Sequence, residues 1–280
     1  MKPTKTTHMN LLNHTITDLK QLGKDKHEEY TNALPFPNIV FDDFFNEELL
    51  NQVTADFPDL AKQKNILAYN SPNEKKLAAK GEQYFSDAAK LLTHFLNSQP
   101  VLEFLQELTG IKEVLMPDPY FVGGGYHEIK PGGLLKVHAD FNKHELTKLD
   151  RRINLLVYLN KDWEESFGGH FELWDKDMTR SYKKILPIFN RVAIFSTTDF
   201  SYHGHPDVLT CPPDRSRKSL ALYYYTNGRP TSEISDTPHN TLFVNRAGVK
   251  NDIREPVTLR SVVVDLIPPI LTKAIKRIKN

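Results

Sequence analysis

Two histidines and one carboxylate have the types and spacing of metal ligands. In the segment LLKVHADFN, His138 and Asp140 stand two residues apart on a predicted strand. Side chains at this spacing point to the same face of a strand, so both can reach one ion. The segment FSYHGHPD offers His203 or His205 as a third ligand, and we favour His203 because it follows an apolar run. The set predicts a 2-His-1-carboxylate iron(II) site with open positions for a chelating co-substrate and O₂.

A keto-acid co-substrate that chelates iron at one end needs a buried cation for its other carboxylate. The segment DRSRKSLALYYYT places Arg217 and Ser219 on one face of a predicted strand. A planar guanidinium binds a carboxylate through two hydrogen bonds, so Arg217 is the predicted anchor, with Arg215 as the alternative and Ser219 as a hydroxyl donor. A second strand, in RRINLLVYLNKDW, is predicted to line the same pocket with Asn154, Leu156 and Tyr158.

The composition describes an ordinary globular chain. Its 280 residues are 39% hydrophobic and 25% charged, and the net charge of +1 gives no overall attraction to nucleic acid. The single cysteine, Cys211, excludes an internal disulfide, a cysteine-rich zinc site and an iron–sulfur cluster. The N-terminus lacks the apolar core of a secretory signal, and no apolar run is long enough to span a bilayer. We therefore expect a cytoplasmic protein.

Helical patterns precede strand patterns along the chain. Residues 1–33 are expected to form a polar, peripheral lead-in, and residues 64–82 a loop. Apolar residues recur at helical spacing in FSDAAKLLTHFLNS and PVLEFLQELTG. After about residue 112, short strands separated by turn residues predict an α+β protein with a β-sandwich or barrel. The candidate strands are 119–129, 134–139, 152–159, 169–174, 183–186, 190–196, 200–203 and 217–225.

The last 50 residues, 231–280, form a predicted C-terminal extension. The stretch TLFVNR is a further candidate strand. Residues 266–280 form a predicted amphipathic helix with a basic face, which would either dock on the protein or attach weakly to an anionic membrane or a partner.

Five ordered motifs resemble one known family. They are GGLLKVHAD, RRINLLVYLNKDW, FGGHFELWD, PIFNRVAIFSTTDFSYHGHP and RSRKSLALYYY, spread over about residues 120–227. This region is similar to the prolyl-4-hydroxylase-like branch of the 2-oxoglutarate and Fe(II)-dependent dioxygenases. The resemblance implies a double-stranded β-helix, or jelly-roll, at about 119–227 within a domain of 34–230, with packing helices mainly from the N-terminal half.

The resemblance also implies an activity and its cofactors. The expected reaction hydroxylates an unactivated C–H bond with O₂ and converts 2-oxoglutarate to succinate and CO₂. Fe(II) would be bound by His138, Asp140 and His203, which are also the expected catalytic residues, and ascorbate is a candidate addition. Lys130 stands near the position of a family tyrosine and is a second alternative contact for 2-oxoglutarate. The residues expected to line the substrate mouth are Glu128, Arg152, Phe171 and Trp174.

Other functions compete with this interpretation. A non-catalytic jelly-roll that binds a metal or a sugar would share the fold, and a zinc hydrolase would use the same three ligands. The ordered Arg217 and Ser219 anchor favours the oxygenase. The substrate is either a peptidyl proline or a small molecule or carbohydrate, and the sequence does not separate these classes.

Overall fold

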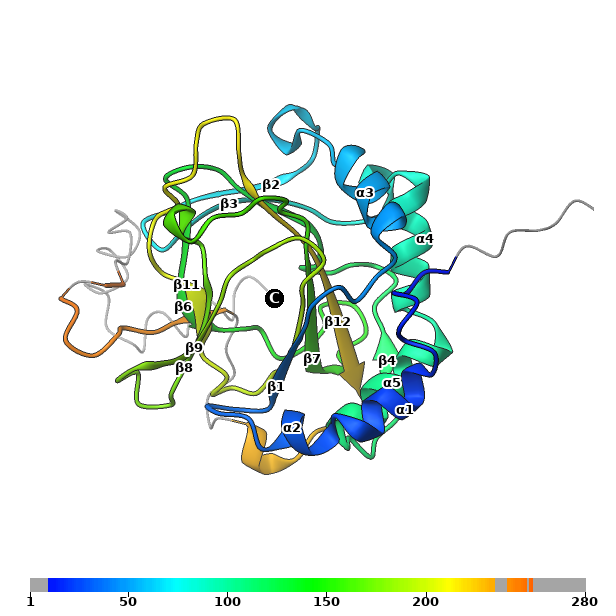
Figure 1. Cartoon of the computed structure of the whole chain (residues 1–280). Coiled ribbons are helices and arrows are strands. Elements are labelled where there is room, and N and C mark those ends of the chain that lie inside the picture. Colours follow the sequence, from blue (N-terminus) through cyan, green and yellow to red (C-terminus); the bar gives the residue numbers. More distant parts are fainter. Residues whose placement is uncertain (1–9, 235–240, 251, 254–280) are drawn as a thin grey trace, which may run out of the picture.

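A curled antiparallel sheet forms the body of the protein (Figure 1). The computed structural model describes residues 10–234, 241–250 and 252–253. Neighbouring strands follow the order β1-β10-β7-β12-β5-β3-β6-β11-β8-β9, with β2 paired to β3, β4 to β12 and β13 to β6. The sheet curls into the two halves of a double-stranded β-helix, as predicted. The strands are β1 (Asn38–Phe41), β2 (Leu67–Asn70), β3 (Glu74–Ala79), β4 (Met116–Pro117), β5 (Gly125–Ile129), β6 (Leu134–Ala139), β7 (Asp150–Tyr158), β8 (Phe171–Trp174), β9 (Ser181–Ile185), β10 (Val192–Ser196), β11 (His203–His205), β12 (Arg217–Thr226) and β13 (Leu242–Phe243).

Helices from the N-terminal half cover one face of the sheet (Figure 1). Ser86 and Asn46 cap two of them, each accepting a hydrogen bond from a backbone N–H of the first turn. Gly110 ends another in the left-handed conformation that favours glycine. The helices are α1 (Leu19–Asp25), α2 (His27–Thr31), α3 (Glu47–Ala55), α4 (Asp87–Leu96) and α5 (Gln99–Thr109), with 3₁₀ turns at Leu60–Lys62, Glu82–Tyr84, Glu165–Phe167 and Thr231–Glu233.

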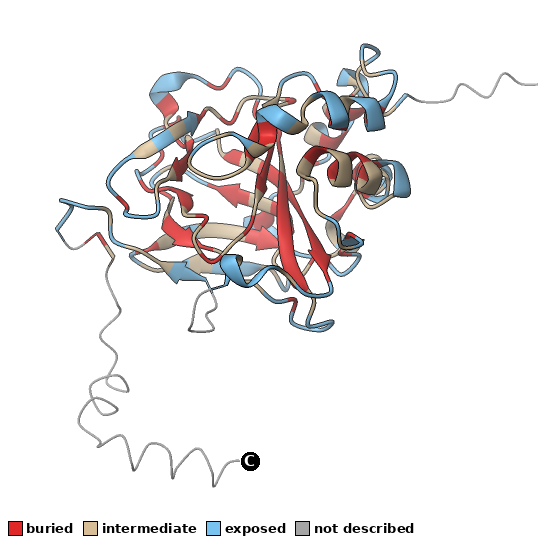
Figure 2. Cartoon of the chain, turned by 90° about the horizontal axis from the view of Figure 1, so that it is seen from below, coloured by how far each residue is buried: buried red, intermediate tan, exposed pale blue. Residues whose placement is uncertain are grey.

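The central strands β7 and β12 are buried along nearly their whole length (Figure 2). Because successive residues of a strand point to opposite sides, alternating apolar residues pack beneath the helices. The residues between them face the interior of the curl, where the polar side chains gather. The helix-facing residues are Ile153, Leu155 and Val157 on β7, and Leu220, Leu222 and Tyr224 on β12.

The expected loop at 64–82 is wrong, because this stretch contains a hairpin. Strands β2 and β3 pair in register from Leu67 opposite Ala78 to Asn70 opposite Lys75. β3 also pairs with β5 and β6, so the hairpin joins the two halves of the sheet. β2 is a mostly exposed outer strand whose sequence, LAYN, does not alternate between apolar and polar residues, so the pattern that identifies a strand is missing.

The ends of the described chain also pack on the core. α1 and α2 fall within the expected lead-in, yet Tyr30 is fully buried and its hydroxyl lies 2.9 Å from Ser196 Oγ. The candidate strand in TLFVNR is present as β13, which pairs with β6 and places Phe243 opposite His138. The predicted basic helix at 266–280 lies outside the described residues. None of the helices in the described ranges has the length and apolarity to cross a membrane.

Candidate metal centre and co-substrate cavity

Strands β6 and β11 bring two histidines and a carboxylate together. His203 pairs directly with His138 across these strands, and their ring centroids are 4.5 Å apart. Asp140 Oδ1 is 3.5 Å from His138 Nε2, and its Oδ2 is 3.3 Å from His203 Nε2. The three ligand atoms lie within 4.8 Å of one another, close enough to bind one ion. Two imidazoles and one carboxylate on one side of an ion suit Fe(II) and leave other positions open.

Backbone carbonyls orient both imidazoles of this cluster. His138 Nδ1 is 2.9 Å from the carbonyl oxygen of Lys136, and His203 Nδ1 is 2.8 Å from that of Ser201. A carbonyl oxygen only accepts, so each Nδ1 carries the proton and donates it. In the neutral form of each ring, the lone pair is then on Nε2, on the side of Asp140. A metal-binding histidine typically has this arrangement, since the outer hydrogen bond sets both tautomer and ring orientation.

A buried arginine controls the charge of Asp140. Arg151 is 1% exposed, and its guanidinium lies between the rings of Phe141 and Tyr223. Its Nη2 donates to Asp140 Oδ2 at 2.9 Å, and Asn154 Nδ2 donates to the same oxygen at 2.7 Å. Burial by itself raises the pKa of Asp140, but the Arg151 charge together with the neighbouring His203 and His138 outweighs burial and holds the pKa well below its usual range. The carboxylate is therefore ionised and ready to bind a cation.

Arg217 reaches the same cavity from the beginning of β12. Its Nε donates to the carbonyl oxygen of Gly169 at 2.8 Å, and its Nη2 is 3.5 Å from the phenol oxygen of Tyr158. Arg217 forms no ion pair with any carboxylate in the part of the chain that the structure describes. Burial lowers its pKa, and Tyr158 offsets this in part. A buried arginine without an acidic partner fits an anionic ligand.

The cavity between Arg217 and the His138–Asp140–His203 cluster is mostly apolar near the cluster. Phe171 and Phe195 lie 5.5 and 4.8 Å from the His203 ring, measured between centroids. Ser219, Asn154 and Leu156 line this cavity, whereas Tyr158 lies behind Arg217, with its phenol oxygen 3.5 Å from Arg217 Nη2. The other lining residues are Lys76, His127, Ile129, Leu135, Gly204, His205 and Tyr223.

Sequence reasoning missed Lys76 and His127. Lys76 comes from the unpredicted hairpin, and its Nζ is 3.4 Å from Glu74 Oε2. His127 Nε2 is 3.1 Å from the carbonyl oxygen of Gly123, and burial lowers the pKa of His127 to about 3, with the Lys76 charge second. His127 stands on β5 directly beside Ser219 of β12, so alternation along 125–129 was the available signal.

Five predicted residues lie away from the cavity lining. Arg152 faces the other side of β7 and pairs with Glu113 and Glu233, because the β7–β12 register shifts there and turns Arg151 inward instead. Lys130 pairs with Asp59 at the surface, so the contact expected at that position is not made from Lys130. Arg215 donates to the backbone of 161–162, Glu128 accepts from Ser216, and the Trp174 indole donates to Glu172.

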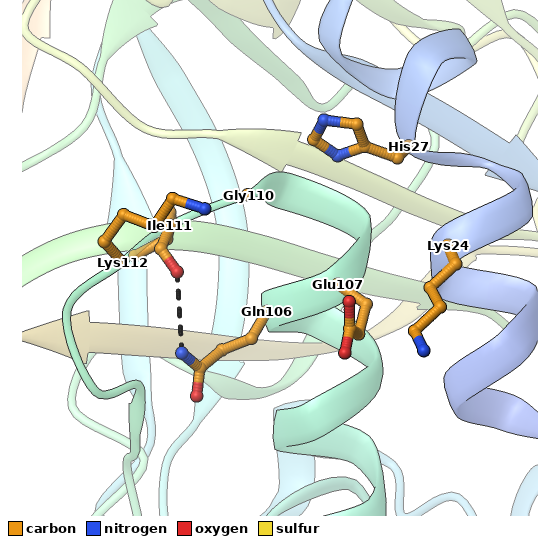
Figure 3. A pocket seen from close by; sticks show the side chains of 7 residues that line it. All are labelled: Lys24, His27, Gln106, Glu107, Gly110, Ile111 and Lys112. Atoms are coloured by element: carbon orange, nitrogen blue, oxygen red, sulfur yellow. Dashed lines mark hydrogen bonds between the residues drawn. The ribbon is translucent and has the colours of Figure 1, made fainter.

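A larger hollow of about 470 Å³ lies elsewhere, beside α1 and the end of α5 (Figure 3). Lys24, His27 and Glu107 border it, and Gln106 donates to the carbonyl oxygen of Ile111 at its edge. The group of three metal-ligating side chains found in the described residues lies in the other cavity. We therefore place the candidate site at His138, Asp140 and His203.

Solved structures share this fold. A prolyl-4-hydroxylase from Pseudomonas putida aligns with a TM-score of 0.54 at 16% identity over 75% of this chain and 100% of its own. A prolyl hydroxylase from Trichoplax adhaerens, in complex with a hypoxia inducible factor peptide fragment, gives 0.52 at 17% identity over 74% and 90%. The carbocyclase SnoK from nogalamycin biosynthesis gives 0.51 at 12% identity over 82% and 96%. The fold is therefore the double-stranded β-helix of this class of oxygenases.

A family model matches the sequence of the same region. Residues 124–225 match the model of the 2OG-Fe(II) oxygenase superfamily, which covers β5 to β12 and both ends of the cavity. This segment of the chain is therefore similar in sequence to the 2OG-Fe(II) oxygenase superfamily, and the solved prolyl hydroxylases share its fold. No curated protein matches the sequence.

Proposed function

We propose that this protein is an Fe(II) and 2-oxoglutarate-dependent dioxygenase that hydroxylates an unactivated C–H bond of its substrate. One observation carries the proposal: the buried His138–Asp140–His203 cluster shares a cavity with Arg217, a buried cation without an acidic partner in the described chain. A chelating keto acid needs both features, one for each of its ends.

Each group in the cavity has a separate task in this proposal. His138, Asp140 and His203 hold the metal from one side, and Arg151 keeps Asp140 ionised and fixed. Arg217 binds the distal carboxylate of 2-oxoglutarate with Tyr158 beside it. The aromatic rings around His203 exclude water from the reacting end. When bound, Fe(II) and 2-oxoglutarate supply the oxidising chemistry, in which O₂ converts the keto acid to succinate and CO₂ and hydroxylates the substrate.

Two substrate classes remain in the proposal. The similar prolyl hydroxylases, one solved with a peptide fragment, support a peptidyl proline. The similar carbocyclase from nogalamycin biosynthesis supports a small molecule, and a carbohydrate belongs to this second class. Peptide and metabolite libraries, screened in parallel for substrate-dependent succinate formation, separate the two classes. Ascorbate and the cytoplasmic location stay predictions.

The metal site is tested by binding and by turnover. With Fe(II) and no O₂, addition of 2-oxoglutarate to the wild type should produce a visible charge-transfer band, and O₂ should then yield succinate. His138→Ala should lose both signals, because one of three ligands is gone. His94→Ala changes an exposed histidine on α4 and should keep both. Succinate formation by His138→Ala at the wild-type rate would show that the site is wrongly placed, and a wild type without the band would favour a zinc hydrolase or a binding protein.

The co-substrate anchor is tested by a pair of neighbouring arginines. Arg217→Ala should raise the 2-oxoglutarate concentration needed for half-maximal turnover by at least about 30-fold, because loss of one partner of a buried charged pair costs about 2–5 kcal/mol. Arg215→Ala should leave this requirement unchanged, because Arg215 donates to backbone carbonyls at the surface. The opposite result would assign the anchor to Arg215.

A further inference from the structure

His205 is a buried histidine whose closest polar contact within the described chain is the backbone of Asp207, at a geometry poorer than that of a normal hydrogen bond. It is 3% exposed on β11, and neither Nδ1 nor Nε2 forms a hydrogen bond of normal geometry. A buried imidazole usually satisfies at least one nitrogen, because leaving both unpaired loses the bonds that water would make. The imidazole therefore has a hydrogen bond to offer a ligand that enters the cavity lined by His205.

The position of His205 in the sheet separates it from the metal cluster. His203 pairs with His138, whereas His205 pairs with Leu135, three residues earlier on β6. The register shift between these pairs places His205 about 10 Å along β6 from His138, at 3.3 Å per residue. The cluster that could hold a metal ion accordingly contains His203 and leaves out His205.

The other basic groups on this cavity wall already have protein partners. Lys76 Nζ pairs with Glu74, and His127 Nε2 lies within hydrogen-bond distance of the Gly123 carbonyl. Arg217 uses Nε on Gly169 and has no acidic partner in the described chain. Lys76, Arg217 and His205 line the same cavity. Of these basic groups, His205 and Arg217 are thus the two that keep a donor for one anion.

We propose that His205 donates a hydrogen bond to the distal carboxylate of 2-oxoglutarate, beside Arg217. This inference rests on the proposed function and deepens it. A neutral imidazole donates from one ring nitrogen, and its second nitrogen accepts from water or another donor in the cavity. His205 is then a co-substrate-binding residue, and it is distinct from the metal ligand His203 two residues earlier.

The test measures binding without turnover. In the absence of O₂, the Fe(II)-loaded protein is titrated with 2-oxoglutarate and with 2-oxobutyrate, a keto acid without a distal carboxylate, and the charge-transfer band gives each affinity. His205→Leu should weaken 2-oxoglutarate binding about 10-fold, the lower end of what a hydrogen bond to a charged group contributes. The same variant should bind 2-oxobutyrate and Fe(II) as the wild type does. His205→Gln retains a donor and should recover part of the affinity.

Matched controls make each result decisive. His94→Leu changes an exposed histidine on α4 and should bind both keto acids normally. Thermal unfolding checks that each variant is folded; should His205→Leu fail to fold, His205→Phe, whose ring fills similar space, replaces it. Unchanged 2-oxoglutarate affinity in a folded donor-free variant, or an equal loss for both keto acids, overturns the assignment. Loss of Fe(II) binding overturns it in favour of a metal ligand, whereas a wild type that binds neither keto acid contradicts the proposed function itself.

Discussion

At the scale of single residues, the chemistry of the candidate site depends on which side chains have partners and which do not. Asp140 accepts hydrogen bonds from both Arg151 and Asn154. These bonds fix the charge and the orientation of the carboxylate before a metal ion binds. Arg217 and His205 have donors to spare in the same cavity. The satisfied groups therefore hold the site in shape, and the unsatisfied groups indicate where a ligand belongs.

Two adjacent arginines allow the role of Arg151 to be measured. Arg151→Met should lower Fe(II) affinity about 10- to 100-fold, the usual effect of removing a group that holds a metal ligand. Arg152→Met removes a buried arginine that pairs with Glu113 and Glu233 on the other side of the strand. It should lower the melting temperature and leave Fe(II) affinity unchanged.

Metal titration and thermal unfolding of both arginine variants distinguish these effects. Equal loss of Fe(II) affinity in Arg151→Met and Arg152→Met would mean that Arg151 acts through general stability and has no special place beside Asp140.

At the scale of elements, the close approach of β11 to β6 brings His203 to His138. Gly204 permits this approach, because a Cβ there would lie 2.7 Å from the Leu135 carbonyl oxygen and 2.9 Å from that of Lys136. Both contacts are with backbone, which cannot rotate away as a side chain can. The spacing of these two strands therefore requires the absence of a side chain at position 204.

Gly204→Ala should move β11 away from β6. Fe(II) affinity should fall about 10-fold or more, because the two histidines would no longer share one ion at the same distance. Gly132→Ala is the matched control: it adds strain at a positive φ of 75°, but its Cβ meets no atom within 4 Å. The control should lose about 1–2 kcal/mol of stability and keep its Fe(II) affinity. Normal metal binding by Gly204→Ala would show that the sheet tolerates the added methyl group.

At the scale of the whole molecule, one face of the sheet packs against the helices and the other face lines the cavity. The outer face of β7, β10 and β12 packs against the helices through a large apolar core, and the inner face forms the cavity. Figure 2 shows that the central strands are buried and that the helices carry both buried and exposed residues. Stability and ligand binding therefore depend on different sets of residues.

A substitution in the core between the helices and the sheet should lower stability and leave metal binding unchanged. Leu105 on α5 is fully buried in the outer core, and Leu105→Ala should lower the free energy of unfolding by about 2–5 kcal/mol. Leu91 on α4 is 42% exposed, so Leu91→Ala should change it by less than about 0.5 kcal/mol. Denaturant unfolding measures both. Folded Leu105→Ala should bind Fe(II) as the wild type does, and a weakened site would show that helix packing reaches the cavity.

The sequence by itself determined the fold and most of the residues that meet in the cavity. Alternation along 154–158 and 217–219 depends only on the two-residue period of a strand, and it assigned these side chains to one face. The order of the motifs predicted the jelly-roll, which is confirmed, and the 2OG-Fe(II) oxygenase superfamily, whose model matches residues 124–225.

The tertiary structure decided which way a side chain points where alternation along a strand cannot predict it. A register shift on β7 turns Arg151 inward and Arg152 outward, and a second shift between β6 and β11 separates His205 from His203. Lys76 reaches the cavity only because the β2–β3 hairpin pairs with strands far along the chain. The physical reason is common to all three. A bulge or a long-range strand pair changes the direction of a side chain through partners that the local sequence does not contain.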